Sequence, residues 1–145
     1  MSTPRPASGS RPPGWQQEHA RRYVESGGKD GHIWESVTTL LLTTTGRRSG
    51  QARTTPLIYG RDGDRYVVVA SRGGAPQHPA WYENLAAHPE VTVQVMADRF
   101  KARARTASAA ERPALWKTMA AIWPPYDEYQ AKTSRTIPVV ILERA

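Results

Sequence analysis

A five-residue glycine turn at 46–50, with the sequence GRRSG, is the first place in this chain where side chains could bind a charged ligand. It follows an apolar, threonine-rich run at 38–45, which predicts a buried strand ending at the turn. Two glycines can direct backbone N–H groups toward one anion, and nearby side chains add donors that suit phosphate or carboxylate. These donors are Arg47, Arg48, Ser49 and Arg53. The alternative is a basic hairpin turn that only faces solvent.

The same combination of glycine, arginine and serine recurs at residues 71–76, which read SRGGAP. A helix containing a Trp-Tyr pair is expected to follow at 79–87. Two such loops beside aromatic side chains could clamp a flat, anionic ligand. In that arrangement the ligand would be a cofactor that carries the chemistry, and the protein would orient it.

Most familiar catalytic and metal sites have no counterpart in this sequence. The chain contains no cysteine, which excludes disulfides, thiolate zinc sites, iron–sulfur clusters and cysteine nucleophiles. Its four histidines are scattered, so no metal site is expected. The sequence has no G-x-G-x-x-G motif after a strand, no Walker A loop, no G-x-S-x-G nucleophile elbow and no H-E-x-x-H motif. Ser71, His78 and Asp127 could be written as a serine–histidine–acid set, but nothing in their spacing supports one.

The composition predicts one basic domain. The chain has 145 residues, a formal net charge of +7 and a pI near 10.1, so it should attract nucleic acid, membrane surfaces or acidic small molecules. Its basic residues are not strung along one helix with interleaved aromatics, which disfavours nucleic acid. No apolar run approaches the roughly 20 residues of a membrane span, and no signal-peptide core is found. We therefore expect a soluble, cytoplasmic protein.

Residues 1–30 are expected to lie outside the main domain, which would span 31–145. Residues 1–14 are rich in Pro, Ser, Gly and Arg, and predict a disordered tail. Trp15, His19 and Tyr23 recur every four residues and predict an amphipathic helix at 15–26. That helix could pack on the rest of the fold, contact the ligand site, or rest on the inner face of the membrane.

Hairpins predict the organisation of the remaining chain. Asp62-Gly63 is a turn signal that should pair a strand at 65–71 with the strand before it, and a second tight turn is expected at Asp98. Pro56 limits the second strand to an edge or a bulge. The six expected strands are 38–45, 53–59, 65–71, 91–97, 99–106 and 137–142.

Helices interrupt these strands. Ser108 and Glu111 form a capping box that opens a helix ending before Pro124-Pro125, and one or two helical turns are expected at 126–129. With the helix at 79–87, this order favours an α+β fold. Its mostly antiparallel sheet of about six strands would curl into a small barrel with two to four helices.

Four segments, in order along the chain, carry a resemblance to a known family. They are LLLTTTGRRSGQARTTPLIY at 40–59, DGDRYVVVASRGGAPQHPAWYENL at 62–85, HPEVTVQV at 88–95 and PPYDEYQAKTSRTIPVV at 124–140. The sequence resembles the deazaflavin (F420)-dependent nitroreductase family, a branch of the split β-barrel flavin-binding proteins. The resemblance implies a split barrel that transfers a hydride from reduced coenzyme F420 to a small acceptor such as a quinone or a nitroaromatic compound.

The resemblance also implies which residues bind the cofactor. The first glycine turn would contact the phosphate and glutamate tail of the cofactor. The segments 54–58 and 69–72 would line the deazaflavin, and the start of the 79–87 helix would close over it. The residues so implied are Arg47, Arg48, Ser49, Arg53, Thr54, Thr55, Pro56, Leu57, Ile58, Val69, Ala70, Ser71, Arg72, Gly73, Ala80, Trp81, Tyr82, Glu83 and Asn84. The family often has lysine at the positions of Arg48 and Arg72, and arginine keeps the charge but changes the geometry.

A second set of residues would act on the acceptor. Ser71 could donate a hydrogen bond to it during reduction, or could instead cap its own loop. Tyr126 and Tyr129 match aromatic positions of the family's acceptor pocket, and Trp123 stands where some members have tyrosine. The alternative for these three aromatic residues is packing of the C-terminal helices against the barrel, which is the role expected of Trp116.

Other functions remain open on the sequence alone. The same fold could bind FMN or haem, and cofactor identity in the purified protein would separate these cases. A non-catalytic F420 carrier or sensor would bind tightly without turnover. The oligomeric state could be monomer or homodimer.

Overall fold

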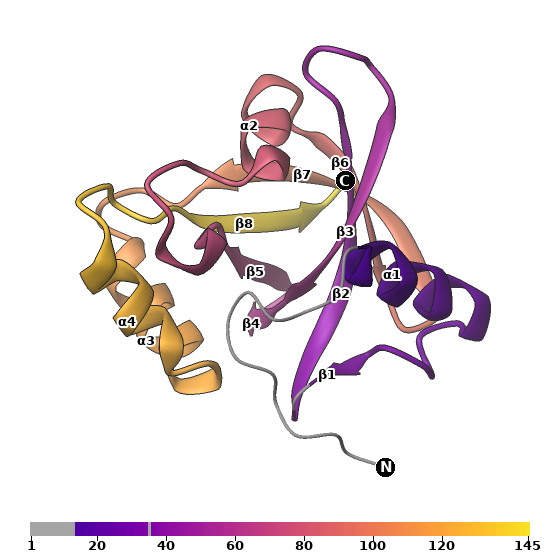
Figure 1. The fold of residues 1–145 in the computed structure, drawn as a ribbon, viewed down its shortest axis with the longest axis horizontal. Helices are drawn as coiled ribbons and strands as arrows, with labels where there is room; N and C mark the ends of the chain where they lie inside the picture. The colour runs from indigo at the N-terminus through magenta and orange to yellow at the C-terminus, as the bar shows by residue number, and fades with distance from the viewer. Residues whose placement is uncertain (1–13, 35) are drawn as a thin grey trace.

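An antiparallel sheet of eight strands curls around its own inner face (Figure 1). The structure, a computed structural model, describes residues 14–34 and 36–145; all but one residue of the tail expected at 1–14 lie outside these ranges. The strand order is β1-β2-β6-β7-β8-β5-β4, and β3 pairs with β2 off this path. The strands are β1 (Ile33–Trp34), β2 (Val37–Thr45), β3 (Ala52–Ile58), β4 (Gly60–Asp62), β5 (Arg65–Val69), β6 (Glu90–Val95), β7 (Asp98–Thr106) and β8 (Val139–Arg144).

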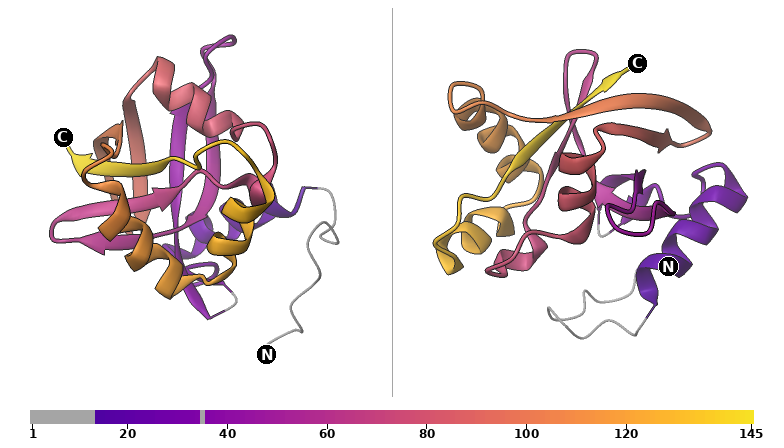
Figure 2. Two further views of the ribbon diagram at one scale, coloured as in Figure 1. Left: turned by 90° about the vertical axis from the view of Figure 1, so that its left-hand side faces the viewer. Right: turned by 90° about the horizontal axis from the view of Figure 1, so that it is seen from above.

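Four α-helices and one short 3₁₀ helix surround this sheet. They are α1 (Trp15–Ser26), η1 (Arg72–Gly74), α2 (Ala80–Ala87), α3 (Arg112–Ile122) and α4 (Pro125–Lys132). Helix α1 lies on one side of the sheet, and α3 and α4 lie together on the other (Figures 1 and 2). Helix α2 sits against β2 and β7. The predicted α+β split barrel is therefore confirmed.

One apolar cluster fills the inside of the curled sheet, and a second fills the space under α3 and α4. Val67, Val68 and Val69 are all buried, which confirms the expectation that this strand is covered on both faces. Val68 belongs to the inner cluster with Trp81, whereas Val67 and Val69 pack with Met119 beneath the helices. Strand β5 is thus the wall between the two halves of the core.

The strand count and one pairing differ from the sequence prediction. The described residues form eight strands instead of six, because the short β1 and β4 carry no periodicity that a pattern could reveal. The hairpin at Asp62-Gly63 exists, but β5 pairs with β4 and β8, not with β3. The chain changes partner at Gly60, which is buried under Met119 so closely that an added Cβ would lie 2.7 Å from the Met119 sulfur. Pro56 lies on β3, which pairs with β2 alone among the described strands.

One turn lies slightly earlier in the chain than the sequence predicts. The turn between β6 and β7 is formed by Met96 and Ala97, and Asp98 already pairs with Val95. The capping box is confirmed, since the Ser108 backbone N–H donates to Glu111 and the Glu111 backbone N–H donates to the Ser108 hydroxyl. The remaining predicted elements are present with boundaries one to three residues away.

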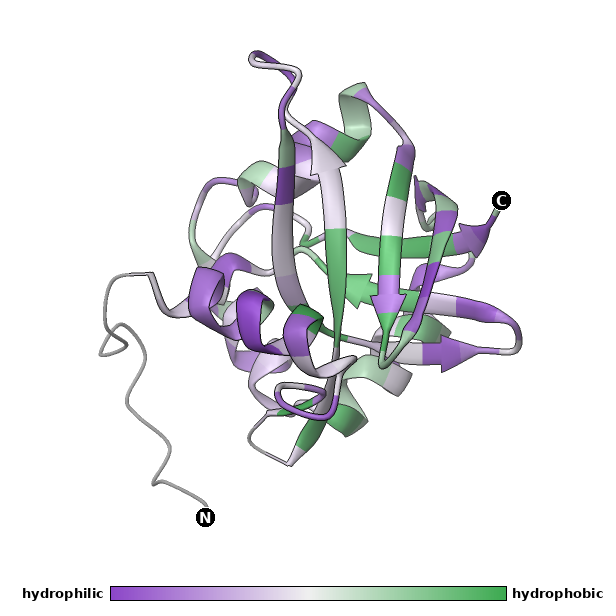
Figure 3. Ribbon diagram, turned by 90° about the vertical axis from the view of Figure 1, so that its right-hand side faces the viewer, coloured by the Kyte–Doolittle hydropathy of each residue, from purple (hydrophilic) through white to green (hydrophobic). Residues whose placement is uncertain are grey.

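Helix α1 is fastened to the sheet by its buried tyrosine. The Tyr23 hydroxyl donates to the Thr39 carbonyl at 3.0 Å and accepts from the Met96 backbone N–H at 2.7 Å. Ala20 and Tyr23 pack on Leu41 of β2. In Figure 3 the ribbon of α1 is coloured mostly hydrophilic, and it lies in front of strands that include hydrophobic stretches. Two side chains of α1, those of Ala20 and Tyr23, are therefore covered by the sheet, whereas Val24 is exposed. Contact of α1 with a membrane is not supported, and the division of the chain at residue 30 stays a prediction.

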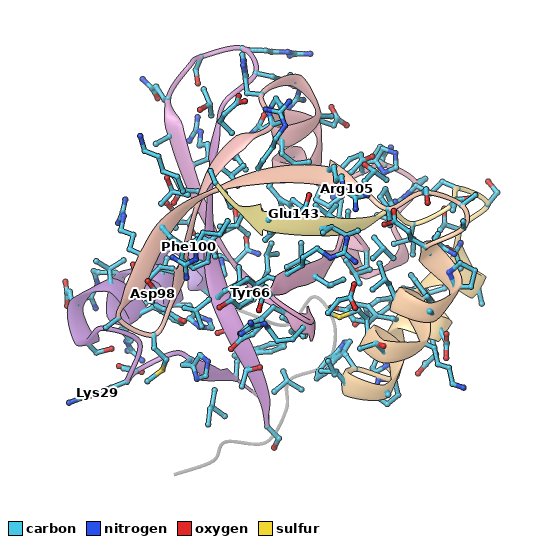
Figure 4. All side chains as sticks on the ribbon, turned by 180° about the vertical axis from the view of Figure 1, so that it is seen from behind. Lys29, Tyr66, Asp98, Phe100, Arg105 and Glu143 are labelled. Atoms are coloured by element: carbon cyan, nitrogen blue, oxygen red, sulfur yellow. The ribbon has the colours of Figure 1, made fainter. Side chains whose placement is uncertain are left out.

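The far side of the sheet carries ion pairs. Arg105 of β7 and Glu143 of β8 lie side by side at 3.4 Å, and Arg105 also pairs with Glu111 (Figure 4). Beneath them the Tyr66 and Phe100 rings pack with centroids 5.6 Å apart. These contacts join β7, β8 and the segment before α3.

Candidate functional site

Two adjoining pockets open between α1, the β2–β3 hairpin, η1 and α2. We call the first the aromatic pocket, about 740 Å³, because Trp15, Trp34, Trp123, Tyr126 and Tyr129 line it. The second, about 870 Å³, is the arginine pocket, lined by Arg21, Arg47, Arg48 and Arg53 among others. The two pockets share the lining residues Gln16, Arg47, Thr55, Ala80 and Trp81. An elongated ligand could therefore occupy both at once.

Arg47 is held at the junction of the two pockets by α2. The carboxamide oxygen of Asn84 accepts from the Arg47 backbone N–H at 3.1 Å and from Nη1 at 3.0 Å. Asn84 is 5% exposed, and its Nδ2 donates to the Thr44 hydroxyl at 3.3 Å. Nη2 of Arg47 pairs with the Glu83 carboxylate at 3.0 Å. The guanidinium is thus oriented before any ligand arrives, and Glu83 already supplies it with one negative charge.

The glycine N–H groups of the first turn are not available to an anion, which corrects the backbone part of the sequence prediction. Gly46 N–H donates to the Gln51 carbonyl at 2.8 Å, and Gly50 N–H donates to the Gly46 carbonyl at 2.9 Å. Ser49 Oγ accepts from the Gln51 N–H at 3.1 Å. The turn closes on itself because its short loop places these groups opposite one another. Any anion bound here would therefore contact groups other than the two glycine N–H groups, such as side chains.

Arg48 and Arg53 are the side chains left for that purpose. Both are exposed at the arginine pocket, and neither makes a hydrogen bond or ion pair with any residue that the structure describes. In contrast, Arg21 on the α1 side is paired with Glu18 and Glu25. The unpaired positive charge of the pocket therefore comes from the β2–β3 hairpin. Its donors fit carboxylate or phosphate.

The aromatic pocket is bounded by apolar residues of β3 and β5 and by a row of tryptophans. Pro56 and Val69 are buried, and Leu57 lies beside them. The Trp15 and Trp34 rings stack with centroids 6.0 Å apart, and Trp34 packs at 5.5 Å from Trp123. The row joins α1, β1 and the end of α3, three segments far apart in sequence. Such a pocket suits a flat aromatic ligand.

The second glycine loop is fixed from behind by Arg135. Its guanidinium donates to the backbone carbonyls of Ala75 at 2.8 Å, Ser71 at 2.8 Å and Ala70 at 3.3 Å. Burial, with the nearby charge of Arg72, lowers the pKa of Arg135. Arg135 nevertheless remains a pure donor, since a guanidinium does not lose its proton in proteins at ordinary pH.

Glycine is required at one position of this loop. Gly74 has φ +83°, and a Cβ added there would lie 2.7 Å from the carbonyl oxygen of Tyr129. Its neighbour Gly73 has φ +62° but faces open space and lines the aromatic pocket. The loop therefore packs tightly on α4 at Gly74 and leaves room toward the pocket at Gly73.

The tyrosines of α4 differ in exposure. Tyr126 is 5% exposed, with its ring between Trp116 at 6.2 Å and Tyr129 at 6.1 Å. Burial raises the pKa of Tyr126, with a smaller contribution from Tyr129, so its phenol stays protonated. Trp116 is only half-buried at the edge of the core and donates to Asp127 at 2.8 Å. Asp127 is therefore committed to Trp116, and no serine–histidine–acid set forms with Ser71 and His78.

Nearly all residues predicted for the site line one of the two pockets. Ala70 and Tyr82 do not: Ala70 is fully buried, and the Tyr82 hydroxyl is hydrogen-bonded to Thr106 Oγ1 at 2.8 Å. The aromatic pocket takes Pro56, Leu57, Ile58, Val69, Ser71, Arg72, Gly73, Glu83, Trp123, Tyr126 and Tyr129. The arginine pocket takes Arg48, Ser49, Arg53, Thr54 and Asn84, and Arg47, Thr55, Ala80 and Trp81 belong to both. Their roles toward a ligand stay predictions.

Several lining residues were missed by the sequence reasoning. Trp15, Gln16 and His19 come from α1, whose contact with the ligand site had been one of three alternatives. Trp34 lies on β1, which has no pattern to mark it. His78 lies between η1 and α2, and it had been considered only as part of the unsupported triad. The sequence feature that could have marked His78 as a site residue is its position just before the proline that starts a helix.

Two further findings limit the kind of site. Within residues 14–34 and 36–145, no group of three or more His, Asp or Glu side chains is placed to hold a metal ion. None of the helices in the same ranges is long and apolar enough to cross a membrane.

Comparison with known proteins places the chain in a family. The model of the F420H(2)-dependent quinone reductase family matches residues 15–144, and the chain belongs to this family. An F420H(2)-dependent quinone reductase of Mycobacterium tuberculosis is 42% identical in an alignment of 135 residues that covers 87% of each chain. The sequence-based resemblance to F420-dependent reductases is thereby confirmed.

Two solved structures support the same placement. One, described as a domain-swapped dimer, is 42% identical, with a TM-score of 0.71 over 88% of this chain and 96% of its own. The other is an F420-H2 dependent reductase, FDR-A, which is 44% identical with a TM-score of 0.68, over 72% of this chain and 93% of its own. The family match includes the residues of α1.

Proposed function

We propose that this protein binds coenzyme F420 across the two pockets and catalyses the reduction of a quinone by the reduced cofactor. The observation that carries the proposal is the shared wall of the pockets, with Arg47 and Trp81 at the junction, in a chain of the F420H(2)-dependent quinone reductase family. This proposal also takes up the sequence prediction of a hydride-transferring oxidoreductase.

The donor set fits the cofactor. Coenzyme F420 has a flat deazaflavin ring at one end and an anionic tail of phosphate and glutamate at the other. The arginine pocket offers the exposed side chains of Arg48 and Arg53 for the tail. The aromatic pocket offers Pro56 and Trp81, both buried, as apolar surface for the ring. A site in which one end is basic and the other aromatic suits this ligand better than a purely apolar one.

When bound in its reduced form, F420 supplies a hydride. Reduction of a quinone to its hydroquinone consumes that hydride and one proton, which is taken from water. The chain's own residues position the reactants and restrict water. In our proposal, the Ser71 hydroxyl hydrogen-bonds the acceptor, and Trp123, Tyr126 and Tyr129 form the wall against which it lies. The Tyr126 phenol is a hydrogen-bond donor in this setting, because burial raises its pKa.

The proposal also concerns which acceptors the protein reduces. A nitroaromatic substrate would have to fit beside Trp123, which is 5% exposed and already packed on Trp34. We therefore expect quinones to be reduced faster than bulky nitroaromatic compounds. Association of two copies is a prediction that light scattering on the purified protein would test.

An anaerobic turnover assay tests the proposal. Purified protein would be mixed with reduced F420 and menadione, and the return of oxidised F420 absorbance would be followed. We expect catalysis with F420 and none with reduced FMN. The double variant Arg48→Ala/Arg53→Ala should raise the KM for F420, whereas Arg99→Ala, an exposed arginine of β7, should not. Tight F420 binding without turnover would favour a carrier or sensor, and preference for FMN or haem would overturn the cofactor assignment.

A further inference from the structure

His78 lines the aromatic pocket from the segment between η1 and α2. Its side chain is half-buried, and its ring packs on Tyr82 with centroids 4.8 Å apart. Tyr82 is itself held by its hydrogen bond to Thr106. The imidazole is thus confined on one side by a fixed aromatic ring and borders the pocket on another.

Arg135 determines which nitrogen of His78 carries the proton. Nη1 of Arg135 lies 3.0 Å from Nδ1 of His78. A guanidinium has only donors, so Nδ1 must be the acceptor of this hydrogen bond. In the neutral imidazole the proton therefore lies on Nε2. The contact selects one tautomer out of two.

Arg135 cannot easily turn away from His78. Three backbone carbonyls, those of Ala70, Ser71 and Ala75, receive the other bonds of the same guanidinium. The backbone carbonyl of Arg135 in turn accepts from Gln130 Nε2 of α4 at 2.8 Å. The tautomer of His78 is therefore set by a network that spans the second glycine loop and α4.

The selected N–H has no hydrogen-bond acceptor within residues 14–34 and 36–145. Among the residues that the structure describes, no group accepts a hydrogen bond from His78 Nε2, although the residue lines the aromatic pocket. A donor at a pocket wall without a protein acceptor is available to a ligand. Ser71 lines the same pocket. Two hydrogen-bond donors, a hydroxyl and an imidazole N–H, therefore belong to residues that line the aromatic pocket.

We propose that His78 donates a hydrogen bond from Nε2 to a carbonyl oxygen of the ligand in the aromatic pocket, and that Arg135 is the positioning residue that fixes this donor. The proposal rests on the function proposed above. Carbonyl oxygens occur both on the pyrimidine edge of a deazaflavin and on a quinone. A bond to the cofactor would strengthen its binding, whereas a bond to the quinone would stabilise negative charge on its oxygen as the hydride arrives.

The tautomer can be tested without any ligand. Long-range ¹H–¹⁵N correlation spectra of uniformly ¹⁵N-labelled protein distinguish a protonated from an unprotonated ring nitrogen, and His78→Phe would assign the His78 signals. We expect an unprotonated Nδ1 in the wild type and a mixed tautomer in Arg135→Gln, with the exposed His88 unchanged between the two. A protonated Nδ1 at His78 in the wild type would overturn the assignment.

Binding and kinetics test the ligand contact. His78→Phe keeps a ring against Tyr82 but removes the donor, His78→Gln keeps an N–H donor, and His88→Phe is the matched control. We expect His78→Phe to weaken binding or catalysis roughly 2–10-fold, the effect of one hydrogen bond, with partial recovery in His78→Gln. A rise in the F420 dissociation constant alone assigns the contact to the cofactor. A change in quinone kcat or KM alone assigns it to the acceptor.

Failure of this inference differs from failure of the proposed function. If wild-type protein binds F420 and reduces menadione while His78→Phe matches it in both measurements, the inference is wrong and the function stands. If the wild type neither binds F420 nor reduces menadione, the proposed function fails, and with it the ligand contact. The spectra of His78 still decide the role of Arg135 in that case.

Discussion

The two glycine loops look alike in sequence but are anchored in opposite ways. The first, at 46–50, is the tip of the β2–β3 hairpin, which extends beyond the rest of the sheet (Figure 1). It closes through its own backbone bonds, and among the described residues its hydrogen bonds and ion pair to α2 all come from Arg47. The second, at 71–76, is fastened by Arg135 and packs on the α4 backbone at Gly74.

This difference matches the two ends of an F420-like ligand. The loop beside the aromatic pocket is fixed, which suits a reaction that needs a ring and an acceptor held in one geometry. The loop beside the arginine pocket presents exposed charges on a hairpin tip, which suits a flexible anionic tail. Substitutions that loosen the second loop should therefore cost stability and catalysis, whereas those at the first should mainly affect the affinity for the tail.

The largest effect is expected from Arg135→Met. The substitution removes the donor to the Ala70 and Ala75 carbonyls and to His78 Nδ1, and one of the two donors to the Ser71 carbonyl, which keeps the Gly74 N–H. We expect the free energy of unfolding to fall by about 3–4 kcal/mol, measured by urea denaturation. The control is Arg99→Met on the exposed face of β7, which should change it by less than about 0.5 kcal/mol. Equal losses in both variants would contradict the anchoring of the second loop.

A smaller effect is expected from Gly74→Ala. The new Cβ would press on the Tyr129 carbonyl in a left-handed backbone conformation. We expect a loss of about 2–3 kcal/mol. Gly73→Ala has a similar φ but open space around it, and should cost about 1 kcal/mol. Thermal unfolding of the pair separates the close approach to α4 from backbone strain alone, and identical melting temperatures would show that the approach is unimportant.

Asn84→Ala tests the only contact of the first loop with α2 besides the Glu83 ion pair among the described residues. Loss of the buried amide removes both hydrogen bonds between Asn84 and Arg47, and it removes the donor to the Thr44 hydroxyl. We expect a stability loss of about 1–2 kcal/mol. F420 binding should weaken roughly threefold, because Arg47 is no longer oriented before binding. Unchanged affinity in a titration would mean that Arg47 needs no positioning by α2.

The smallest effect concerns a histidine in neither loop. Burial lowers the pKa of His32, whose Nε2 lies 3.1 Å from the Tyr59 hydroxyl. The unfolded chain therefore takes up this proton more readily than the folded one, so the folded state loses stability as pH falls below about 6.5, the ordinary histidine value. His32→Gln should flatten that part of the pH–stability profile, and His88→Gln should not. A wild-type slope retained in His32→Gln would assign the effect to another group.

The sequence predicted local features well because local chemistry produces them. The capping box at Ser108 depends on residues three apart, and the burial of Val67, Val68 and Val69 follows from three consecutive β-branched residues. The resemblance motifs also placed most site residues, although composition alone would have left only two basic glycine loops.

Long-range features could not be read in this way. Arg135 bonds to groups between 57 and 65 residues away, and its bonds to carbonyls leave no pattern in the sequence. The exchange of partner at Gly60 depends on packing under Met119, which no strand periodicity reveals. Trp34 and Trp15 meet only once α1 has docked on β2. These features are long-range tertiary contacts, and they determine the details of the aromatic pocket.

A titration that separates the two pockets tests the central claim most directly. Wild-type protein and Arg48→Ala/Arg53→Ala would each be titrated with F420 and with the tail-less deazaflavin nucleoside, following ligand fluorescence. Our account predicts that the double variant binds F420 roughly tenfold more weakly and the tail-less compound as well as the wild type does. Equal losses for both ligands, or no loss for either, would contradict a single cofactor site that spans the aromatic and arginine pockets.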